Sequence, residues 1–142
     1  MKRILTLPLA LLTVITCCLT MASATNNVLP RASLTLTGYA ATMKAGSTSG
    51  ELRISYDVAA TMLANKVGVS EIKIYKANGT CVATITGSTS NGLVRTSYNT
   101  HKGTYSYFAT PGTNYYAVVT VFAETSTAYD SRDVTTVAVK AP

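Results

Sequence analysis

The chain has 142 residues, of which 47% are hydrophobic and 13% charged, and it carries 12 basic against 6 acidic residues. This length fits one domain that can bury a core without help from metals or disulfides. The basic residues are scattered and form no run or helical stripe. The net charge of +6 therefore argues against a nucleic-acid-binding protein and allows only loose attraction to anionic walls or glycans.

The beginning of the chain shows the pattern of a cleaved secretion signal. Lys2 and Arg3 precede an uncharged apolar stretch over residues 4–19, and Ala22-Ser23-Ala24 forms a small-x-small cleavage site. The apolar stretch is short for a membrane span, and no basic cluster follows it. The chain therefore divides into three predicted parts, a signal peptide at 1–24, a short polar leader at 25–31 and a domain at 32–142. We expect the mature protein to be secreted.

Two of the three cysteines lie in the predicted signal. Cys17 or Cys18 could be the acylated residue of a lipoprotein, but neither follows the small residue that such a site needs. Cys81 alone would remain after cleavage, so the mature domain cannot close an internal disulfide. Because Cys81 sits in a strand pattern, we expect it to be a small buried hydrophobe.

The first two runs of the domain alternate with period two. In residues 32–43, Leu34 and Leu36 fall on one face, opposite Ser33, Thr35 and Thr37, and Gly38 predicts a bulge or bend. In residues 51–60, a set of apolar side chains alternates with charged and polar ones; the apolar set is Leu52, Ile54, Tyr56 and Val58. One buried and one open face indicate an antiparallel sheet.

A hairpin follows. Ile72 and Ile74 alternate with polar residues, Asn78-Gly79 offers the two positive-φ positions of a tight type I′ turn, and residues 81–85 return. Asn78-Gly79-Thr80 also matches a glycosylation acceptor, which matters only in a eukaryotic secretory path.

The second half of the chain predicts three more main strands and a short edge strand. Residues 86–103 are polar and glycine-punctuated, which indicates a long crossing connection with a short edge strand at 93–98; a strand over 104–109 comes next. Both faces of 115–123 are apolar, so this strand is predicted near the centre of a sheet. After a loop at 124–132, residues 134–140 close the sheet. Seven strands of this kind fit an all-β, Greek-key β-sandwich.

The IYKANGT hairpin at 74–80, the PGTNYYAVVTV segment at 111–121 and the missing disulfide resemble fibronectin type III and bacterial immunoglobulin-like modules. More closely, the chain is similar to small exported proteins of Gram-positive, clostridial-type gut bacteria, which share the SEIxIYKxNGT pattern at 70–80, a Gly-Thr-x-Tyr-Tyr-Ala strand at 112–120 and Asp-Ser-Arg at 130–132. The function of that family is not known, so the resemblance implies a fold and a location but no activity.

The resemblance also assigns structural roles. It implies that Tyr115 is a tyrosine corner, with a buried ring and a hydroxyl bonded to a backbone group near 111–113. Tyr56 is the nearest substitute for the tryptophan usual on the second strand of fibronectin type III domains.

The reactive side chains do not combine into a catalytic site. Glu124, Asp130 and Asp133 cluster across the last predicted loop and could ligate calcium, although a polar loop in which Asp130 or Asp133 pairs with Arg132 is the favoured interpretation. His101 is expected in an exposed loop. The sequence therefore predicts no enzyme and no cofactor.

Two predicted loops, at 61–68 and 124–132, emerge at the same end of such a sandwich. They carry the candidate binding residues Met62, Leu63, Lys66, Tyr129 and Arg132, although Met62 or Leu63 could instead plug the core. Tyrosine and arginine are enriched where interfaces gain most of their energy.

These loops predict a secreted recognition module for a protein or glycan outside the cell, which includes a bacterial effector acting on host receptors. The alternative is a structural component of the cell envelope or extracellular matrix. We expect no nucleic-acid partner, no stable membrane anchor and a monomer, unless an exposed edge strand pairs two copies.

Overall fold

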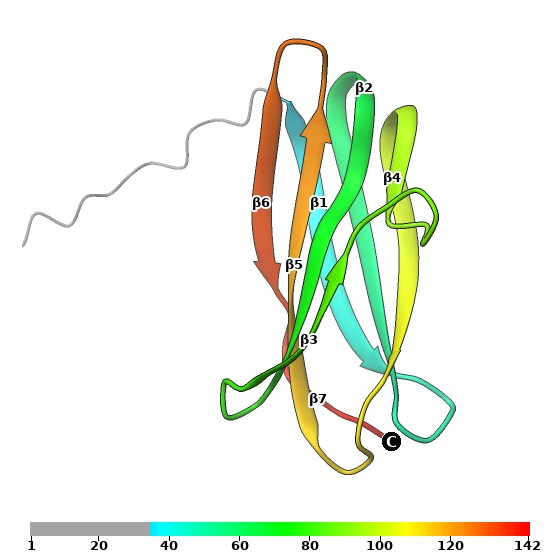
Figure 1. Cartoon of the computed structure of the whole chain (residues 1–142), viewed down its shortest axis with the longest axis vertical. Helices are drawn as coiled ribbons and strands as arrows, with labels where there is room; N and C mark the ends of the chain where they lie inside the picture. Colours follow the sequence, from blue (N-terminus) through cyan, green and yellow to red (C-terminus); the bar gives the residue numbers. More distant parts are fainter. Residues whose placement is uncertain (1–34) are drawn as a thin grey trace, which may run out of the picture.

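The computed structural model describes residues 35–142, and all regular structure in this part is antiparallel β-sheet, as the sequence predicts. The strands are β1 (Leu36–Ala45), β2 (Glu51–Lys76), β3 (Cys81–Thr86), β4 (Val94–Phe108), β5 (Asn114–Glu124), β6 (Tyr129–Thr135) and β7 (Val139–Lys140). They form one curled sheet (Figure 1). The predicted signal peptide and leader lie outside the described residues. Residues 35–142 contain no helix long and apolar enough to cross a membrane.

Strand β2 organises the sheet because it bends near its middle into two arms (Figure 1). The first arm, residues 51–60, pairs with β1 on one side and with the second part of β4 on the other. The second arm, residues 66–76, pairs with β5 on one side and with the start of β4 and then β3 on the other, and β5 in turn pairs with β6 and β7. The bend therefore carries the chain from one part of the sheet to another and brings β1 close to β5 and β6.

The core lies between the two arms of β2. The period-two pattern predicted for residues 51–60 is confirmed, since Leu52 and Ile54 are fully buried whereas Arg53 and Ser55 are exposed. Further fully buried aliphatic side chains come from both arms of β2 and from β5, namely Val58, Val67, Val69, Ile72, Ile74, Val119 and Val121. Burying each such side chain stabilises the fold by roughly 1.5–3 kcal/mol. Strand β5 is central, as predicted, because it pairs with β2 on one side and β6 on the other.

Strand β1 follows the expected pattern only in part. The predicted bulge at Gly38 is confirmed by a register shift between Leu36 and Gly38. Thr35, which the alternation places on the open face, is instead buried. Its carbonyl oxygen accepts a hydrogen bond from the Thr61 amide at 2.8 Å, so Thr35 is enclosed where the chain meets the bend of β2.

The hairpin between β2 and β3 exists, but its turn differs from the predicted type. Only Gly79 has a positive φ, of 86°, whereas a type I′ turn needs a positive φ at Asn78 as well. The Gly79 amide donates to the Lys76 carbonyl, which makes a three-residue loop with a glycine bulge. The Asn78 Oδ1 atom accepts from the Thr80 amide at 3.1 Å, and this local bond favours the observed turn.

Three predicted connections turn out to be strand in whole or in part, and the loop predicted at 61–68 lies entirely within β2. The crossing predicted at 86–103 ends at Leu93, because β4 runs without a break from Val94 through the polar residues 99–103. These residues find backbone partners along β2 although their side chains carry no alternating pattern. The loop predicted at 124–132 is likewise only Thr125–Ala128, closed by the Thr125 amide donating to the Ala128 carbonyl at 2.8 Å.

Candidate functional site

The two ends of the molecule differ in what they display (Figure 1). We call the end that contains the bends of β2 and β4 and the β5–β6 loop the apical end; it is uppermost in Figure 1. The opposite, basal end holds the turns at 46–50, 77–80 and 110–113 and the C-terminus.

The bend of β2 exposes two apolar side chains at the apical end. Ala59 pairs with Thr100 and Ala64 with Tyr98, so the four residues 60–63 of β2 lie opposite Asn99 alone. This extra length of β2 cannot pair with β4 and bulges outward. Met62 and Leu63 are therefore 60% and 67% exposed, and neither plugs the core.

The bend of β4 adds an aromatic ring beside them. Ser97 adopts a φ of 59°, the left-handed region that non-glycine residues rarely enter. The next residue, Tyr98, is 44% exposed, and the Arg95 guanidinium carbon lies 3.5 Å from its ring centroid. This cation–π contact, worth about 0.5–1 kcal/mol at an exposed site, holds the ring in place.

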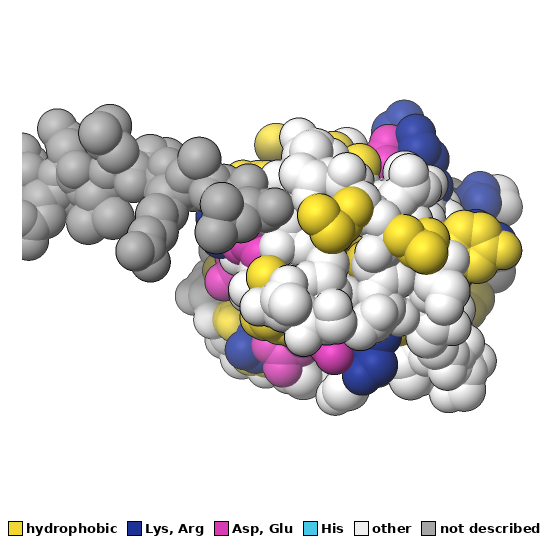
Figure 2. Space-filling model, turned by 90° about the horizontal axis from the view of Figure 1, so that it is seen from above, with side chains coloured by type: hydrophobic (Ala, Val, Ile, Leu, Met, Phe, Trp, Pro, Cys, Tyr) yellow, Lys and Arg dark blue, Asp and Glu magenta, His cyan; other side chains and the backbone are white. Residues whose placement is uncertain are grey.

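Tyr129 supplies a second exposed ring at this end. It begins β6, is 59% exposed, and stacks on Phe122 with ring centroids 5.7 Å apart. Met62 also borders a cavity of about 340 Å³ that the β5–β6 loop closes through Thr125 and Ala128. We call Met62, Leu63, Tyr98 and Tyr129 the apical surface. Figure 2 shows hydrophobic side chains standing among mainly uncharged atoms at this end.

The structure brings four of the five predicted binding residues to the apical end but not Arg132. Lys66 pairs in register with Glu124, and its Nζ atom lies 3.6 Å from Glu124 Oε2. Tyr129 is the β6 partner of the same Glu124. Arg132 is three residues further along β6, so its side chain points to the opposite face. There it donates to Asp130 Oδ1 at 2.6 Å.

The predicted calcium ligands do not assemble. Glu124 pairs with Lys66 and Asp130 with Arg132, while Asp133 Oδ1 accepts a hydrogen bond from the Thr120 hydroxyl at 2.7 Å. Asp130 lies on the opposite face of β6 from Asp133, because odd and even residues of a strand alternate. No group of three His, Cys, Asp or Glu side chains within residues 35–142 could hold a metal ion.

Cys81 is exposed, which corrects the expectation of a buried residue. It opens β3, which is paired to β2 alone, and it lies opposite Tyr75. The Tyr75 ring stacks on Tyr116 with centroids 5.2 Å apart. Both rings are only half-buried, so Cys81 shares a face that the core does not cover.

His101 lies in β4 and is half-buried, although an exposed loop was predicted. Its Nε2 atom is 2.7 Å from the Gly92 carbonyl oxygen, and the Tyr56 hydroxyl donates to the same oxygen at 2.8 Å. The two rings meet edge to face at 5.3 Å. Burial raises the pKa of Tyr56 above its ordinary value. This cluster fastens the β3–β4 connection to β2 and β4, a structural role that no local sequence signal revealed.

Tyr115 is buried at the basal end with 2% of its surface exposed. Its hydroxyl oxygen accepts a hydrogen bond from the Thr110 amide at 3.3 Å, one residue before the range named from the sequence. Hydrogen bonding from Thr110 lowers the pKa of Tyr115. The contact ties the 110–113 turn to the start of β5.

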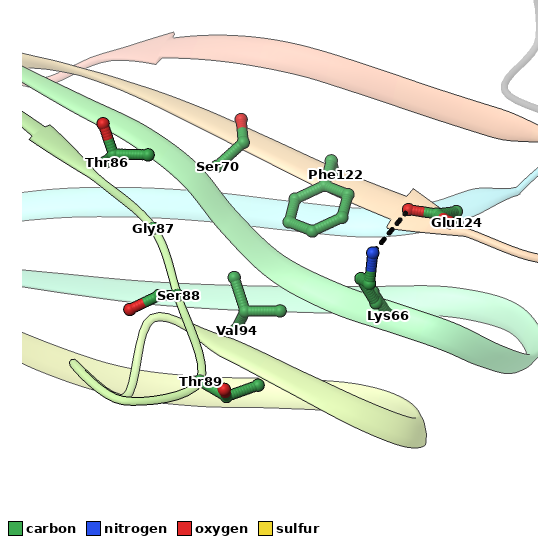
Figure 3. Close-up of a pocket in the computed structure, with 9 residues that line it drawn as sticks. All are labelled: Lys66, Ser70, Thr86, Gly87, Ser88, Thr89, Val94, Phe122 and Glu124. Carbon is green, nitrogen blue, oxygen red and sulfur yellow. Dashed lines mark ion pairs between the residues drawn. The ribbon is translucent and has the colours of Figure 1, made fainter.

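A groove of about 420 Å³ lies beside the apical surface, on the outer face of β2 and β5 (Figure 3). Phe122 and Val94 flank it, Lys66 and Glu124 stand at one end, and the 86–89 segment forms a wall. We call it the Phe122 groove. Sequence reasoning did not find it; the available signal was Gly68, a glycine in a strand pattern, which often marks a close backbone approach.

Comparison with known proteins assigns no family. No protein-family model, no curated protein and no solved structure matches the chain.

Proposed function

We propose that this chain is a secreted, non-enzymatic recognition module that binds a protein or glycan outside the cell through its apical surface. The observation that carries the proposal is the display of two aliphatic and two aromatic side chains, 44–67% exposed, on a frame of paired strands. Exposed apolar groups gathered at one place on a monomer mark interaction sites.

The display is held in place before any partner arrives. Tyr98 is stacked by Arg95 and Tyr129 by Phe122. Tyrosines that are already ordered lose little side-chain entropy on binding, and tyrosine is among the residues that dominate interface energies. Met62 is flexible and can adapt to an irregular partner.

We also propose that the domain is a seven-stranded immunoglobulin-like or fibronectin type III-like sandwich. In support, the first arm of β2 pairs with β1, the second pairs with β3 and β5 with β6 beyond β5, and β4 pairs with both arms. Two such groups of strands around one core are the arrangement expected for this class.

The proposal that the protein is not an enzyme is supported by the ion pairs and hydrogen bonds that its reactive side chains already make. Among the described residues, Asp57 pairs with Lys102 and Glu71 with Lys73, both at the surface. The His101 ring is bonded to a backbone carbonyl and to Tyr56. Each of these contacts has a structural role.

Cell binding tests the apical surface. Labelled purified protein is applied to intact host cells and to bacterial walls, and the variant Met62→Ser/Leu63→Ser is compared with Phe108→Ser/Val137→Ser, whose residues are 64% and 77% exposed away from the apical surface. We expect the apical variant to bind about tenfold or more weakly with an unchanged melting temperature. The control variant should bind like the wild type.

A folded apical variant that binds as tightly as the wild type would contradict the proposal. If that binding also disappears in about 0.5 M salt, where surface charges are screened, the scattered basic residues act as a general envelope adhesive, and the structural alternative is correct. If the apical surface does carry the binding, treating the cells with protease or with periodate shows whether the partner is a protein or a glycan.

Secretion has its own test. Intact mass spectrometry of the protein recovered from culture medium should give a chain that begins at Thr25, directly after the predicted cleavage site. Recovery of the full-length chain from the cytosol would remove the secreted part of the proposal.

A further inference from the structure

We infer that the Phe122 groove is a second binding site and that its ligand is a short neutral saccharide. The groove shares no lining residue with the apical surface, so this site goes beyond the recognition role proposed above. Its volume of about 420 Å³ falls within the range of about 300–1,000 Å³ typical of small-molecule sites.

The register of the sheet creates the hollow. Gly68 of β2 pairs with Phe122 of β5 on one side and with Val94 of β4 on the other. Phe122 and Val94 stand on either side of Gly68, where a side chain would overlap the Leu93 carbonyl oxygen, so glycine lets the chain before Val94 pack directly against β2. Figure 3 shows the two side chains on either side of the second arm of β2. Carbon atoms form most of the lining.

The wall opposite Phe122 is rigid. The Gly87 amide donates to the Ser70 carbonyl at 2.7 Å, and any side chain at Gly87 would overlap the Val69 carbonyl oxygen. The Asn91 side chain braces the same segment, since its amide donates to the Thr86 carbonyl at 2.8 Å and its oxygen accepts from the Ser88 amide at 2.9 Å. A preformed wall lowers the entropy that a ligand must overcome on binding.

Hydroxyl groups and one ion pair surround this apolar floor. The side-chain hydroxyls of Thr86 and Thr89 make no hydrogen bond to any other residue within 35–142, and both line the groove. The contact between Lys66 Nζ and Glu124 Oε2 is an ion pair that is too long for a hydrogen bond, so the ammonium donors and the carboxylate oxygens can still bond to a ligand. The groove thus presents a charged donor and a charged acceptor 3.6 Å apart.

This combination matches a sugar. Neighbouring hydroxyls of a saccharide can accept from Lys66 and donate to Glu124, and hydrogen bonds to charged groups are the stronger ones. The C–H face of the ring can cover Phe122 and Val94 while the threonine hydroxyls bond its edge. Because Glu124 already balances the Lys66 charge, an anion such as phosphate gains little binding energy there. A hydrocarbon ligand would bury the hydroxyls and the ion pair without hydrogen-bond partners.

A titration followed by ¹⁵N–¹H NMR tests the site. Maltotriose, cellotriose and N,N′,N″-triacetylchitotriose, all uncharged, are added to the purified protein up to about 10 mM, a range that detects dissociation constants on the order of 1 mM. We expect at least one trisaccharide to shift the amide signals of Ser70, Gly87 and Val94 in a saturable way. The Lys66→Met variant, which keeps the aliphatic stem but removes the charged donor, should bind about tenfold more weakly.

Two tryptophan variants distinguish blocking of the groove from a general effect of placing a tryptophan in this turn. Thr89→Trp places a large ring in the groove and should abolish the shifts. Ser90→Trp, at the neighbouring exposed position of the same turn that does not line the groove, should retain them. The Met62→Ser/Leu63→Ser variant should also bind the saccharide normally, so loss of cell binding and loss of saccharide binding report on two different proposals.

Three results would overturn the site. They are the absence of saturable shifts with all three saccharides, shifts that persist in folded Thr89→Trp, and shifts that map outside the groove. A short uncharged peptide of glycine, serine and tyrosine is titrated in parallel, and saturation of the groove by the peptide but by none of the saccharides would show that its ligand is a polypeptide.

Discussion

Backbone hydrogen bonds tie the C-terminus into the basal end of the molecule, whereas the apical end presents the exposed side chains of the apical surface. At the basal end, the Gly50 amide donates to the Pro142 carbonyl at 2.7 Å, the Ala109 amide to the Gly50 carbonyl at 2.8 Å and the Gly112 amide to the Ala141 carbonyl at 2.9 Å. These bonds connect the first turn, the fourth strand and the C-terminus. At the apical end, the bend of β2 instead exposes the side chains of Met62 and Leu63.

This difference separates the part of the molecule that stabilises the fold from the part that is free to bind. A side chain that is mostly exposed in the folded protein adds little to the free energy of unfolding, because it is solvated in both states. The exposed apical residues can therefore be replaced without loss of the fold, whereas buried residues of the basal half such as Leu52 and Tyr115 cannot.

The largest expected effect compares one leucine from each region. Leu52 is fully buried where β2 pairs with β1 and β4, whereas Leu63 is 67% exposed at the apical bend. We expect Leu52→Ala to lower the free energy of unfolding by about 2–5 kcal/mol and Leu63→Ala to change it by about 0.5 kcal/mol or less. Urea denaturation of both variants measures this. Similar losses would mean that the apical bend contributes to the core.

The second prediction concerns Tyr115 at the basal end. Tyr115→Phe removes the acceptor of the Thr110 amide and should cost about 1 kcal/mol, the net value of one hydrogen bond. The neighbouring variant Tyr116→Phe is the control, because that ring is stacked on Tyr75 and keeps its contact without the hydroxyl. Thermal denaturation that ranks the two variants in the reverse order would contradict this role for Tyr115.

A smaller effect is expected at the apical end, from the contact between Arg95 and Tyr98. A double-mutant cycle with Arg95→Gln and Tyr98→Leu should give a coupling free energy of about 0.5–1 kcal/mol, the range for a cation–π contact at an exposed site. The Arg95→Gln variant should also bind cells more weakly, because the Tyr98 ring is less ordered without the guanidinium. A coupling of zero would show that the ring is not held by the guanidinium.

The smallest effect is a shift in the pKa of one carboxyl group, that of Glu51 at the basal end. The Ser106 hydroxyl donates to Glu51 Oε1 at 3.0 Å and holds the pKa of Glu51 below its ordinary value. A carboxyl with a lowered pKa stabilises the fold at pH values above its unfolded pKa, and this contribution disappears as the pH falls through the folded pKa.

In Ser106→Ala the pKa of Glu51 should rise towards the ordinary value, so the contribution is lost at a higher pH than in the wild type. An NMR titration of the Glu51 side chain measures both values. An unchanged pKa would assign the shift to the Ser47 and Thr48 amides, which also bond to this carboxylate.

The success of the sequence predictions depended on how local their physical cause was. The alternation around Ile54 and the apolar faces of β5 were visible because a buried strand face needs an apolar residue at every second position. The hairpin at Gly79 was visible because few residues tolerate a positive φ. The turn type at Asn78 was missed because a side-chain bond to Thr80 competes with the expected backbone conformation.

The candidate sites were predicted less well because they depend on pairing across the sheet. Met62, Leu63 and Tyr129 were named from their loops, but the number of residues that bulge from β2 follows from its register with β4. Arg132 was misplaced because the loop before it is shorter than predicted and β6 begins at Tyr129. Cys81 was expected in the core because its position on an edge strand is not visible locally.

The sequence by itself determined that the described chain forms antiparallel strands and which side chains of residues 51–60 face inward, because these properties follow from period-two patterning and turn chemistry within a few residues. The tertiary structure alone decided where β2 bends, which side chains that bend exposes, and that a groove lies between Phe122 and Val94. These features depend on which strands become neighbours, and strand register is set by hydrogen bonds between segments far apart in the chain.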